Sequence, residues 1–191
     1  VELTATQWTS LMRFTFPASH RSNVILNLRR AGGDVEVVGD RTIRGLAKGG
    51  HPKEDADGPW FVAEFSRPFA GFGTFHAAEG EENWGLGDKD VEAGRRTVSG
   101  NYAGAYVSFD TKAGEQVLVR MAHGHSIAEA EARLRAEDPD GDFERVHAQA
   151  RAAWARLFDR VQVSGGTPKQ RMLFYSTLYH SFASPRLVAR K

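Results

Sequence analysis

Two histidines separated by one residue are the first side chains in this sequence that suggest metal chemistry. His123 and His125 on a strand would place both imidazoles on one face, a spacing compatible with metal binding. A protein metal site needs more ligands than two, and no third ligand is visible nearby. We therefore interpret the pair as the end of a strand that leads into a helix cap rather than as a metal site.

An acidic stretch, "DPDGDFE", resembles the start of a calcium-binding loop. Counted from Asp138, the sixth position should be glycine and the twelfth glutamate, but these positions are Phe143 and Gln149. The pattern fails as a calcium loop. We interpret it as a turn followed by Asp142 as the cap of a helix.

An aromatic residue in a long polar segment suggests sugar binding. Trp84 lies in "HAAEGEENWGLGDKDVEAG", where an indole ring can stack on a sugar while carboxylates accept hydrogen bonds from hydroxyl groups. The alternative, favoured by the usual burial of tryptophan, is a solvated hairpin loop with Trp84 folded back onto a sheet. The aromatic residues of "FSRPFAGFGTF" are expected to lie mostly in a core.

Other catalytic signatures are absent from the sequence. It contains no nucleophile elbow, phosphate loop, dinucleotide-binding glycine pattern or H-E-x-x-H helix. Acidic residues are plentiful, but the sequence does not show which two carboxylates face each other across a cleft.

Composition indicates an ordinary globular chain of one domain or slightly more. The 191 residues are 41% hydrophobic, carry a formal charge of +1 and include no cysteine. This balance does not favour a nucleic-acid or anionic-membrane partner, and it excludes disulfides and thiolate sites. The chain starts at Val1 with no basic or apolar signal-peptide pattern, so we expect a signal peptide to be absent or already removed and this terminus to lie inside a longer protein.

The first two thirds of the sequence predict an antiparallel β-sandwich. Short alternating segments are separated by glycine, proline, aspartate and asparagine: "VELTATQ", "LMRFTF", "SNVILNL", "DVEVVGD", "TIRGL", "PWFVAEFS", "NYAGAYVSFD" and "EQVLVRM". We expect this sandwich to extend to about Met121.

Three helices are predicted after the sandwich, near 126–137, 143–158 and 168–183. Ser126 with Glu129 begins the first, and Thr167, Pro168 and Gln170 begin the third. The third helix has an apolar stripe that needs a partner, and its residues recur at three- and four-residue steps: Leu173, Phe174, Leu178, Ser181 and Phe182.

Two long stretches of the sequence resemble a known family. These are "GNYAGAYVSFDTKAGEQVLVRMAHGHSIAEAEARLRAE" and "FERVHAQARAAWARLFDRVQVSGGTPKQRMLFYSTLYHSFASP". Both are similar to glycoside hydrolase family 92, the bacterial exo-acting α-mannosidases. The segments "ELTATQWTSLMRFTFP" and "PWFVAEFSRPFAGFGTF" resemble the family's N-terminal sandwich, so the resemblance covers nearly the whole chain.

The resemblance implies a mainly β fold, in which an antiparallel sandwich is joined by a helical linker to an (α/α)6 barrel. It implies a sandwich over 1–122, a linker over 123–160 and the start of the barrel over 161–191. The third helix would then be the first barrel helix, and its apolar stripe would face barrel helices that this sequence does not contain.

The resemblance also implies calcium-dependent hydrolysis of α-linked mannose with inversion at the anomeric carbon, by a secreted or periplasmic protein. It places the acid, the base and the calcium ligands beyond this sequence, so no catalytic or metal-binding residue is assigned here. The partners would be a mannose-containing glycan and the rest of the catalytic domain. Phe69, Phe72 and Trp84 are the predicted substrate-binding residues, lent by the sandwich at the domain interface.

Two other classes of protein remain open. A stand-alone carbohydrate-binding sandwich would account for the strands and Trp84, and a structural or adhesion module would fit the composition. Neither gives a reason for three capped helices after the strands.

Overall fold

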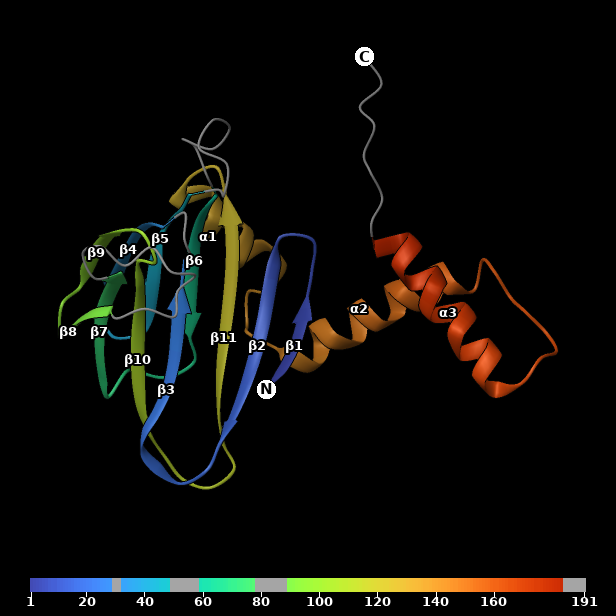
Figure 1. The fold of residues 1–191 in the computed structure, drawn as a ribbon, viewed down its shortest axis with the longest axis horizontal. Coiled ribbons are helices and arrows are strands. Elements are labelled where there is room, and N and C mark those ends of the chain that lie inside the picture. Colours follow the sequence, from blue (N-terminus) through green and yellow to red (C-terminus); the bar gives the residue numbers. More distant parts are fainter. Residues whose placement is uncertain (29–31, 49–58, 78–88, 184–191) are drawn as a thin grey trace, which may run out of the picture. The chain divides into compact units, whose positions relative to one another are not determined.

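The structure, a computed structural model, describes residues 1–28, 32–48, 59–77 and 89–183. In this part of the chain, strands come first and helices follow (Figure 1). The strands are β1 (Glu2–Ala5), β2 (Thr9–Phe16), β3 (Ser19–Asn27), β4 (Gly33–Val38), β5 (Thr42–Ala47), β6 (Trp60–Phe65), β7 (Gly71–Ala77), β8 (Lys89–Ala93), β9 (Thr97–Gly100), β10 (Gly104–Thr111) and β11 (Glu115–Gly124). The helices are α1 (Ile127–Glu137), α2 (Phe143–Phe158) and α3 (Pro168–Ala183). The chain divides into two compact units, residues 1–147 and 148–191, and each is described by itself.

The strands form two antiparallel sheets that pack as a sandwich. The larger sheet has the order β1-β2-β11-β6-β5-β4-β9, and the smaller one has the order β3-β10-β7-β8. This arrangement confirms the predicted antiparallel sandwich. The three helices also begin and end within one residue of their predicted bounds.

Three strands, β7, β8 and β9, were not among the predicted segments. β8 and the end of β7 lie in the segment that was predicted to be a polar loop, so this prediction was wrong for His76, Ala77 and residues 89–93. Aromatic rings lie over one glycine of β7 and over one glycine of the neighbouring strand β10. A Cβ at Gly73 would come 2.5 Å from the ring of Tyr106, and one at Gly104 would come 2.3 Å from the ring of Phe75.

The main core fills the space between the sheets. Buried side chains from both sheets form one cluster, in which Phe109, Val107 and Val117 are fully buried. Alternation along each strand sends these residues inward and their neighbours outward. Burying each large apolar side chain contributes about 1.5–3 kcal/mol.

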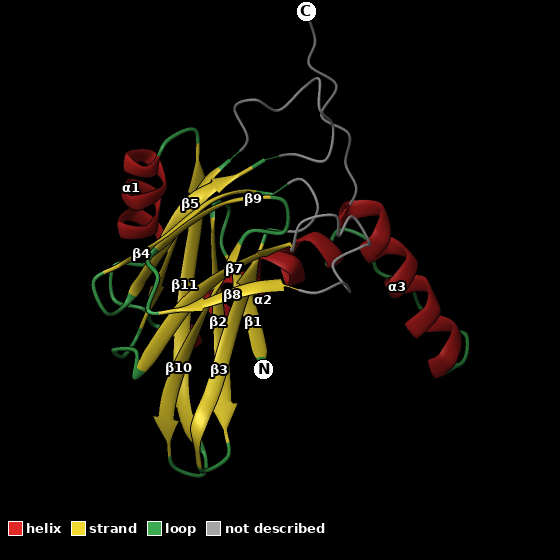
Figure 2. Ribbon diagram, turned by 60° about the vertical axis from the view of Figure 1, so that its left-hand side comes forward, coloured by secondary structure: helices red, strands yellow, loops and turns green. Residues whose placement is uncertain are grey.

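Two smaller apolar clusters lie on the outer face of the larger sheet. α1 packs Ala130 and Leu134 onto Val62 and Ala122, and Figure 2 shows this helix lying beside the sheet. The start of α2 packs Phe143 and Val146 onto Leu11 of β2, and Leu118 of β11 packs against this cluster. β11 is therefore covered by apolar side chains on both faces.

Side-chain caps begin all three helices as the sequence predicted. The Ser126 hydroxyl accepts a hydrogen bond from the Glu129 N–H at 3.1 Å, and Asp142 accepts one from the Arg145 N–H at 3.0 Å. At α3, Thr167 and Gln170 bond reciprocally, with the Thr167 N–H donating to Gln170 at 2.8 Å.

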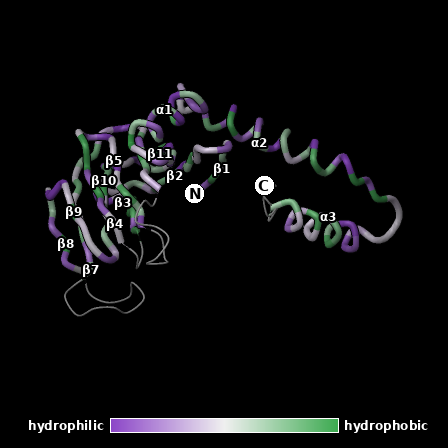
Figure 3. The backbone as a smooth tube through the Cα atoms, turned by 90° about the horizontal axis from the view of Figure 1, so that it is seen from above, coloured by the Kyte–Doolittle hydropathy of each residue, from purple (hydrophilic) through white to green (hydrophobic). Residues whose placement is uncertain are grey.

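Within residues 148–191, the end of α2 and α3 meet through aromatic rings. Trp154 lies 4.8 Å from Tyr179, and Phe158 lies 6.1 Å from Tyr175 and 6.2 Å from Phe182, between ring centroids. Figure 3 shows hydrophobic segments recurring along α3 between hydrophilic ones. None of the described helices is long and apolar enough to cross a lipid bilayer.

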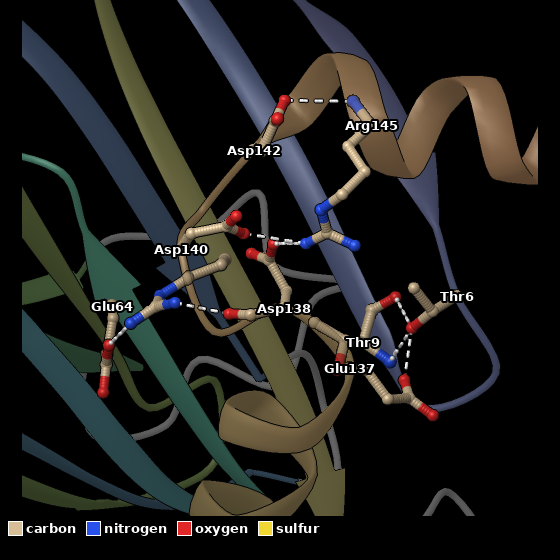
Figure 4. A network of polar contacts seen from close by, with 9 residues as sticks. Thr6, Thr9, Glu64, Glu137, Asp138, Asp140, Asp142 and Arg145 are labelled. Carbon is tan, nitrogen blue, oxygen red and sulfur yellow. Dashed lines mark hydrogen bonds and ion pairs between the residues drawn. The ribbon is translucent and has the colours of Figure 1, made fainter.

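A polar network fixes the connector between α1 and α2 (Figure 4). Arg145 contacts Asp138 at 2.9 Å and Asp140 at 2.8 Å. Arg120 of β11 donates to the Asp138 carbonyl at 2.6 Å and pairs with Glu64 of β6 at 2.7 Å. The connector is thus joined to two strands and to the first turn of α2.

The two carboxylates that share Arg145 have opposite pKa shifts. Asp138 is completely buried, one of its oxygens has no partner among the described residues, and burial raises the pKa of its carboxyl. Asp140 is exposed, and its hydrogen bond to Arg145 lowers the pKa of its carboxyl. Ionisation therefore opposes folding at Asp138 and favours it at Asp140.

The cluster beneath α2 generates a stability prediction for two leucines on paired strands. Leu11 is 0% exposed and Leu3 is 67% exposed, although both strands lie at the same end of the larger sheet. We expect Leu11→Ala to lower the free energy of unfolding by about 2–5 kcal/mol, because it leaves a cavity. Leu3→Ala, the matched control, should change it by at most about 0.5 kcal/mol. Urea denaturation measures both, and equal effects would contradict the burial described for Leu11.

The opposite pKa shifts generate a pH prediction. The stabilisation of wild type relative to Asp138→Asn should fall as pH rises from 3.8 through the raised pKa of Asp138, because the buried group must then ionise. The stabilisation relative to Asp140→Asn should instead fall as pH drops below 3.8 through the lowered pKa of Asp140.

Urea denaturation of the wild type and both variants at several pH values measures these two slopes. Asp90→Asn, an exposed carboxylate in β8, controls for the loss of one surface charge. Slopes of the same sign for the two variants would contradict the assigned shifts.

Candidate functional site

Phe69, one of the predicted substrate-binding residues, packs against the core between β6 and β7. Its ring meets Phe65 edge-on at 5.1 Å and Phe109 at 5.9 Å. The Phe69 N–H donates to the Asp40 carbonyl at 2.8 Å. The residue therefore closes one end of the sandwich beside the β4–β5 turn, and it is half-buried.

Phe72, another of the predicted residues, lies at the start of β7, directly after Gly71, and also packs against the core. The Arg96 guanidinium lies over its ring at 4.6 Å and donates to the Gly39 carbonyl at 2.9 Å. The structure thus brings Phe69 and Phe72 to the same β4–β5 turn. Whether either side chain contacts substrate stays a prediction.

Trp84, the third predicted residue, lies outside the described residues. It follows Ala77, the last residue of β7, whereas Phe72 is near the first. A strand rises about 3.3 Å per residue, so Phe72 and Ala77 are roughly 17 Å apart. β7 itself therefore does not bring the three predicted residues together.

The two histidines do not share a strand face. His123 belongs to β11, but the strand ends at Gly124 and His125 lies in the bend before α1. The His125 N–H donates to the Glu129 carboxylate at 2.7 Å, which completes the cap of α1. No group of three or more potential metal-ligating His, Asp or Glu residues occurs in the described part of the chain.

A tryptophan that the sequence analysis passed over lies beside His123. Trp8 meets the His123 ring edge-on at 5.9 Å, and the Arg133 guanidinium stacks on the indole at 4.0 Å. Arg133 also donates to the His123 carbonyl at 2.6 Å. These contacts join the β1–β2 hairpin to α1, and the isolated position of Trp8 between two strands gave no signal of them.

A pocket of about 390 Å³ adjoins the α1–α2 connector. Its charged lining consists of Arg41, Glu64, Arg120 and Asp140. Glu64 is paired with Arg120, and Asp140 is paired with Arg145. These carboxylates are held by arginines, so they do not form a facing acid and base of the kind that glycoside hydrolysis needs.

Two further pockets of about 210 Å³ lie on the sandwich. One opens between the sheets and is mostly apolar, with Asn27 and His123 as its polar residues. The other lies on the outer face of the larger sheet and includes Trp60. The chain therefore offers binding surfaces, and the described residues do not assemble a catalytic pair or a calcium site.

Comparison with solved structures shows the same fold in known enzymes. The chain is similar to "the Family GH92 Inverting Mannosidase BT2199 from Bacteroides thetaiotaomicron VPI-5482", with a TM-score of 0.79 and 27% identity over 94% of this chain and 23% of that one. The family GH92 α-mannosidase BT3965 from Bacteroides thetaiotaomicron is similar with a TM-score of 0.66 and 21% identity, over 86% of this chain and 22% of that one. The GH92 family glycosyl hydrolase ccman5 is similar with a TM-score of 0.75 and 21% identity, over 96% of this chain and 24% of that one.

The chain therefore spans about a quarter of the length of these proteins. A search of curated protein sequences found no match.

Two family models match consecutive parts of the chain. The "Glycosyl hydrolase family 92 N-terminal domain" matches residues 1–123, and the "Glycosyl hydrolase family 92 catalytic domain" matches residues 129–191. The first match covers the sandwich, and the second covers the helices that follow it. The chain belongs to glycosyl hydrolase family 92.

Proposed function

We propose that this chain is part of a calcium-dependent, inverting exo-α-mannosidase that releases α-linked mannose from glycans. The observation that carries the proposal is the consecutive match of the sandwich and the helices to the two domains of family 92. The similarity to the inverting mannosidase BT2199, at 27% identity over 94% of this chain, supports it. The catalytic-domain match favours a hydrolase over a stand-alone carbohydrate-binding sandwich or an adhesion module.

The chain would contribute structure and substrate contacts, and the rest of the protein would contribute the chemistry. Inversion needs a protonated acid on one side of the glycosidic bond and a base that activates water on the other, about 6.5–9.5 Å apart. Two glutamates that line pockets are paired with arginines, Glu64 with Arg120 and Glu36 with Arg44. The acid, the base and the calcium ligands are therefore proposed to lie outside the described residues.

Substrate contacts from the sandwich are part of this proposal. Phe69, Phe72 and Trp84 remain the proposed residues, lent by loops and strand ends to a mannose-binding pocket. Phe69 and Phe72 are half-buried, so any such contact would use an edge of each ring. The protein is proposed to be secreted or periplasmic, where mannose-containing glycans of other cells are accessible.

The third helix supports the division into a sandwich over 1–122, a linker over 123–160 and the start of an (α/α)6 barrel over 161–191. The sequence stripe of Phe174, Leu178 and Phe182 is divided in the structure. Leu178 and Phe182 are half-buried, whereas Phe174 is 38% exposed. Met172 and Leu173 beside Phe174 are 69% and 68% exposed, and we propose that later barrel helices cover these three residues.

The stereochemistry and metal dependence are tested on the whole protein with 4-nitrophenyl α-mannoside. Proton NMR should show β-mannose as the first product, because water attacks the face opposite the leaving group. Removing calcium with a chelator should lower kcat/KM by at least about 100-fold, and added calcium should restore it. A first-formed α-anomer, or activity of residues 1–191 alone, would contradict the proposal.

The covering of α3 is tested by Leu173→Asp in two settings. In residues 1–191 alone the change should leave stability nearly unaltered and reduce self-association, because the leucine is exposed there. In the whole protein it should lower the free energy of unfolding by several kcal/mol, roughly the cost of burying an unpaired charge.

Light scattering measures the association and urea denaturation measures the stability. The shorter chain is the matched control for the whole protein, since the substitution is identical in both. An equally small effect on stability in the two would show that no barrel helix covers this face.

A further inference from the structure

The outer face of the larger sheet is divided into an apolar half and a polar half. α1 covers the apolar half through Val62 and Ala122. The polar half, on β4, β5 and β9 and the start of β6, forms the pocket of about 210 Å³ that contains Trp60. Ile127, the first residue of α1, forms a wall of this pocket.

Strand register brings the pocket's side chains together from distant parts of the sequence. Trp60 pairs with Leu46, Leu46 pairs with Asp34, and Asp34 pairs with Ser99 across adjacent strands. In the next row, Arg44 pairs with Glu36, and Glu36 pairs with Thr97. Val35, Phe61 and Val98 face the core, so their neighbours in the strands face outward.

The polar groups in this pocket are mostly available to a ligand. Among the described residues, nothing hydrogen-bonds the Asp34 carboxylate, the Thr97 and Ser99 hydroxyls or the Trp60 indole N–H. Arg44 and Glu36 pair at 2.8 Å, so they neutralise each other while keeping further donors and acceptors. A carboxylate, two hydroxyls and an indole N–H thus converge on one pocket.

We infer that this pocket binds one sugar ring of a neutral glycan. Trp60 supplies an aromatic surface against which the apolar face of a sugar ring can pack, and Asp34, Thr97 and Ser99 supply hydrogen-bond partners for its hydroxyls. The paired Glu36 and Arg44 leave Asp34 as the single unbalanced charge, which does not suit a strongly charged ligand. The volume is below the about 300–1,000 Å³ of drug-sized pockets, and this suits one ring rather than an oligosaccharide.

The identity of the sugar rests on the proposed function, whereas the pocket does not. A mannosidase that also holds a second mannose of a branched glycan on its sandwich would stay close to polymeric substrate between cleavages. Mannose is therefore the expected ring, and an α-mannan is the appropriate probe.

The test is affinity electrophoresis of the whole protein in native gels that contain α-mannan. Retardation at increasing polysaccharide concentration gives a dissociation constant for each variant. We expect Trp60→Ala and Asp34→Asn each to weaken binding at least fivefold. Trp8→Ala is the matched control, since it removes a 38% exposed tryptophan from the turn between β1 and β2, and it should leave the constant unchanged.

Thermal unfolding of each variant shows whether it folds. If Trp60→Ala does not fold, Asp34→Asn and Ser99→Ala provide the same test, because neither side chain has a hydrogen-bond partner to lose among the described residues. Equal retardation of the wild type and these variants would overturn the inference. Absence of retardation of the wild type in every gel would overturn it as well.

Gels with an α-glucan and a parallel hydrolysis assay separate this inference from the proposed function. Retardation by α-glucan but not α-mannan, lost in Trp60→Ala, would support the pocket as a glycan site and count against mannose as its ligand. Failure of the wild type to hydrolyse 4-nitrophenyl α-mannoside would count against the proposed function alone.

Discussion

The need to bury β11 on both faces is the constraint on which the rest of this structure depends. Val117 and Val119 of this strand face the second sheet and are almost fully buried. Ala122 faces the other way and is also fully buried, beneath α1. A single sandwich buries only one face of each sheet, so the second face of β11 requires another layer. The helices that follow β11 directly supply that layer.

Covering this outer face with helices removes charged groups from water as well as apolar ones. Arg120 shares one face of β11 with Leu118 and Ala122, so it lies under the same helical layer. The Arg120 guanidinium finds its ion-pair and hydrogen-bond partners there in Glu64 and the Asp138 carbonyl. Such a partly buried ionic network stabilises little compared with an apolar substitute. It does fix which carbonyl and which carboxylates can lie at this point, and this sets where α2 begins.

The sequence was sufficient for elements whose signals are local. Caps at Ser126, Asp142 and Thr167 set the helix starts, because each side chain bonds a backbone N–H only three residues away. β7 and β8 lacked such signals. Gly73 is required by the ring of Tyr106 on a neighbouring strand, and β8 is a polar edge strand of five residues. Local alternation does not reveal either cause.

For the same reason, the sequence does not predict which side chains the strand register brings together. Asp34, Trp60 and Ser99 lie on β4, β6 and β9, and their adjacency depends on the strand order β6-β5-β4-β9. The division of the α3 stripe also depends on tertiary contacts, since Tyr175 and Phe182 rather than Phe174 meet Phe158. A helical period alone identifies apolar positions and leaves open which partner takes each one.

The two halves of the outer face of the larger sheet show that side-chain composition decides whether a helix can pack on a strand. Val62 and Ala122 are small and apolar, so they accept a helix at close distance. On the next two strands, β5 and β4, Arg44 and Glu36 form an ion pair, and a helix laid over them would have to desolvate both charges. Helical cover is therefore favourable over β11 and β6 and unfavourable over β4 and β9. The polar half remains open to ligands because the residues that make it polar also make it a poor surface for packing.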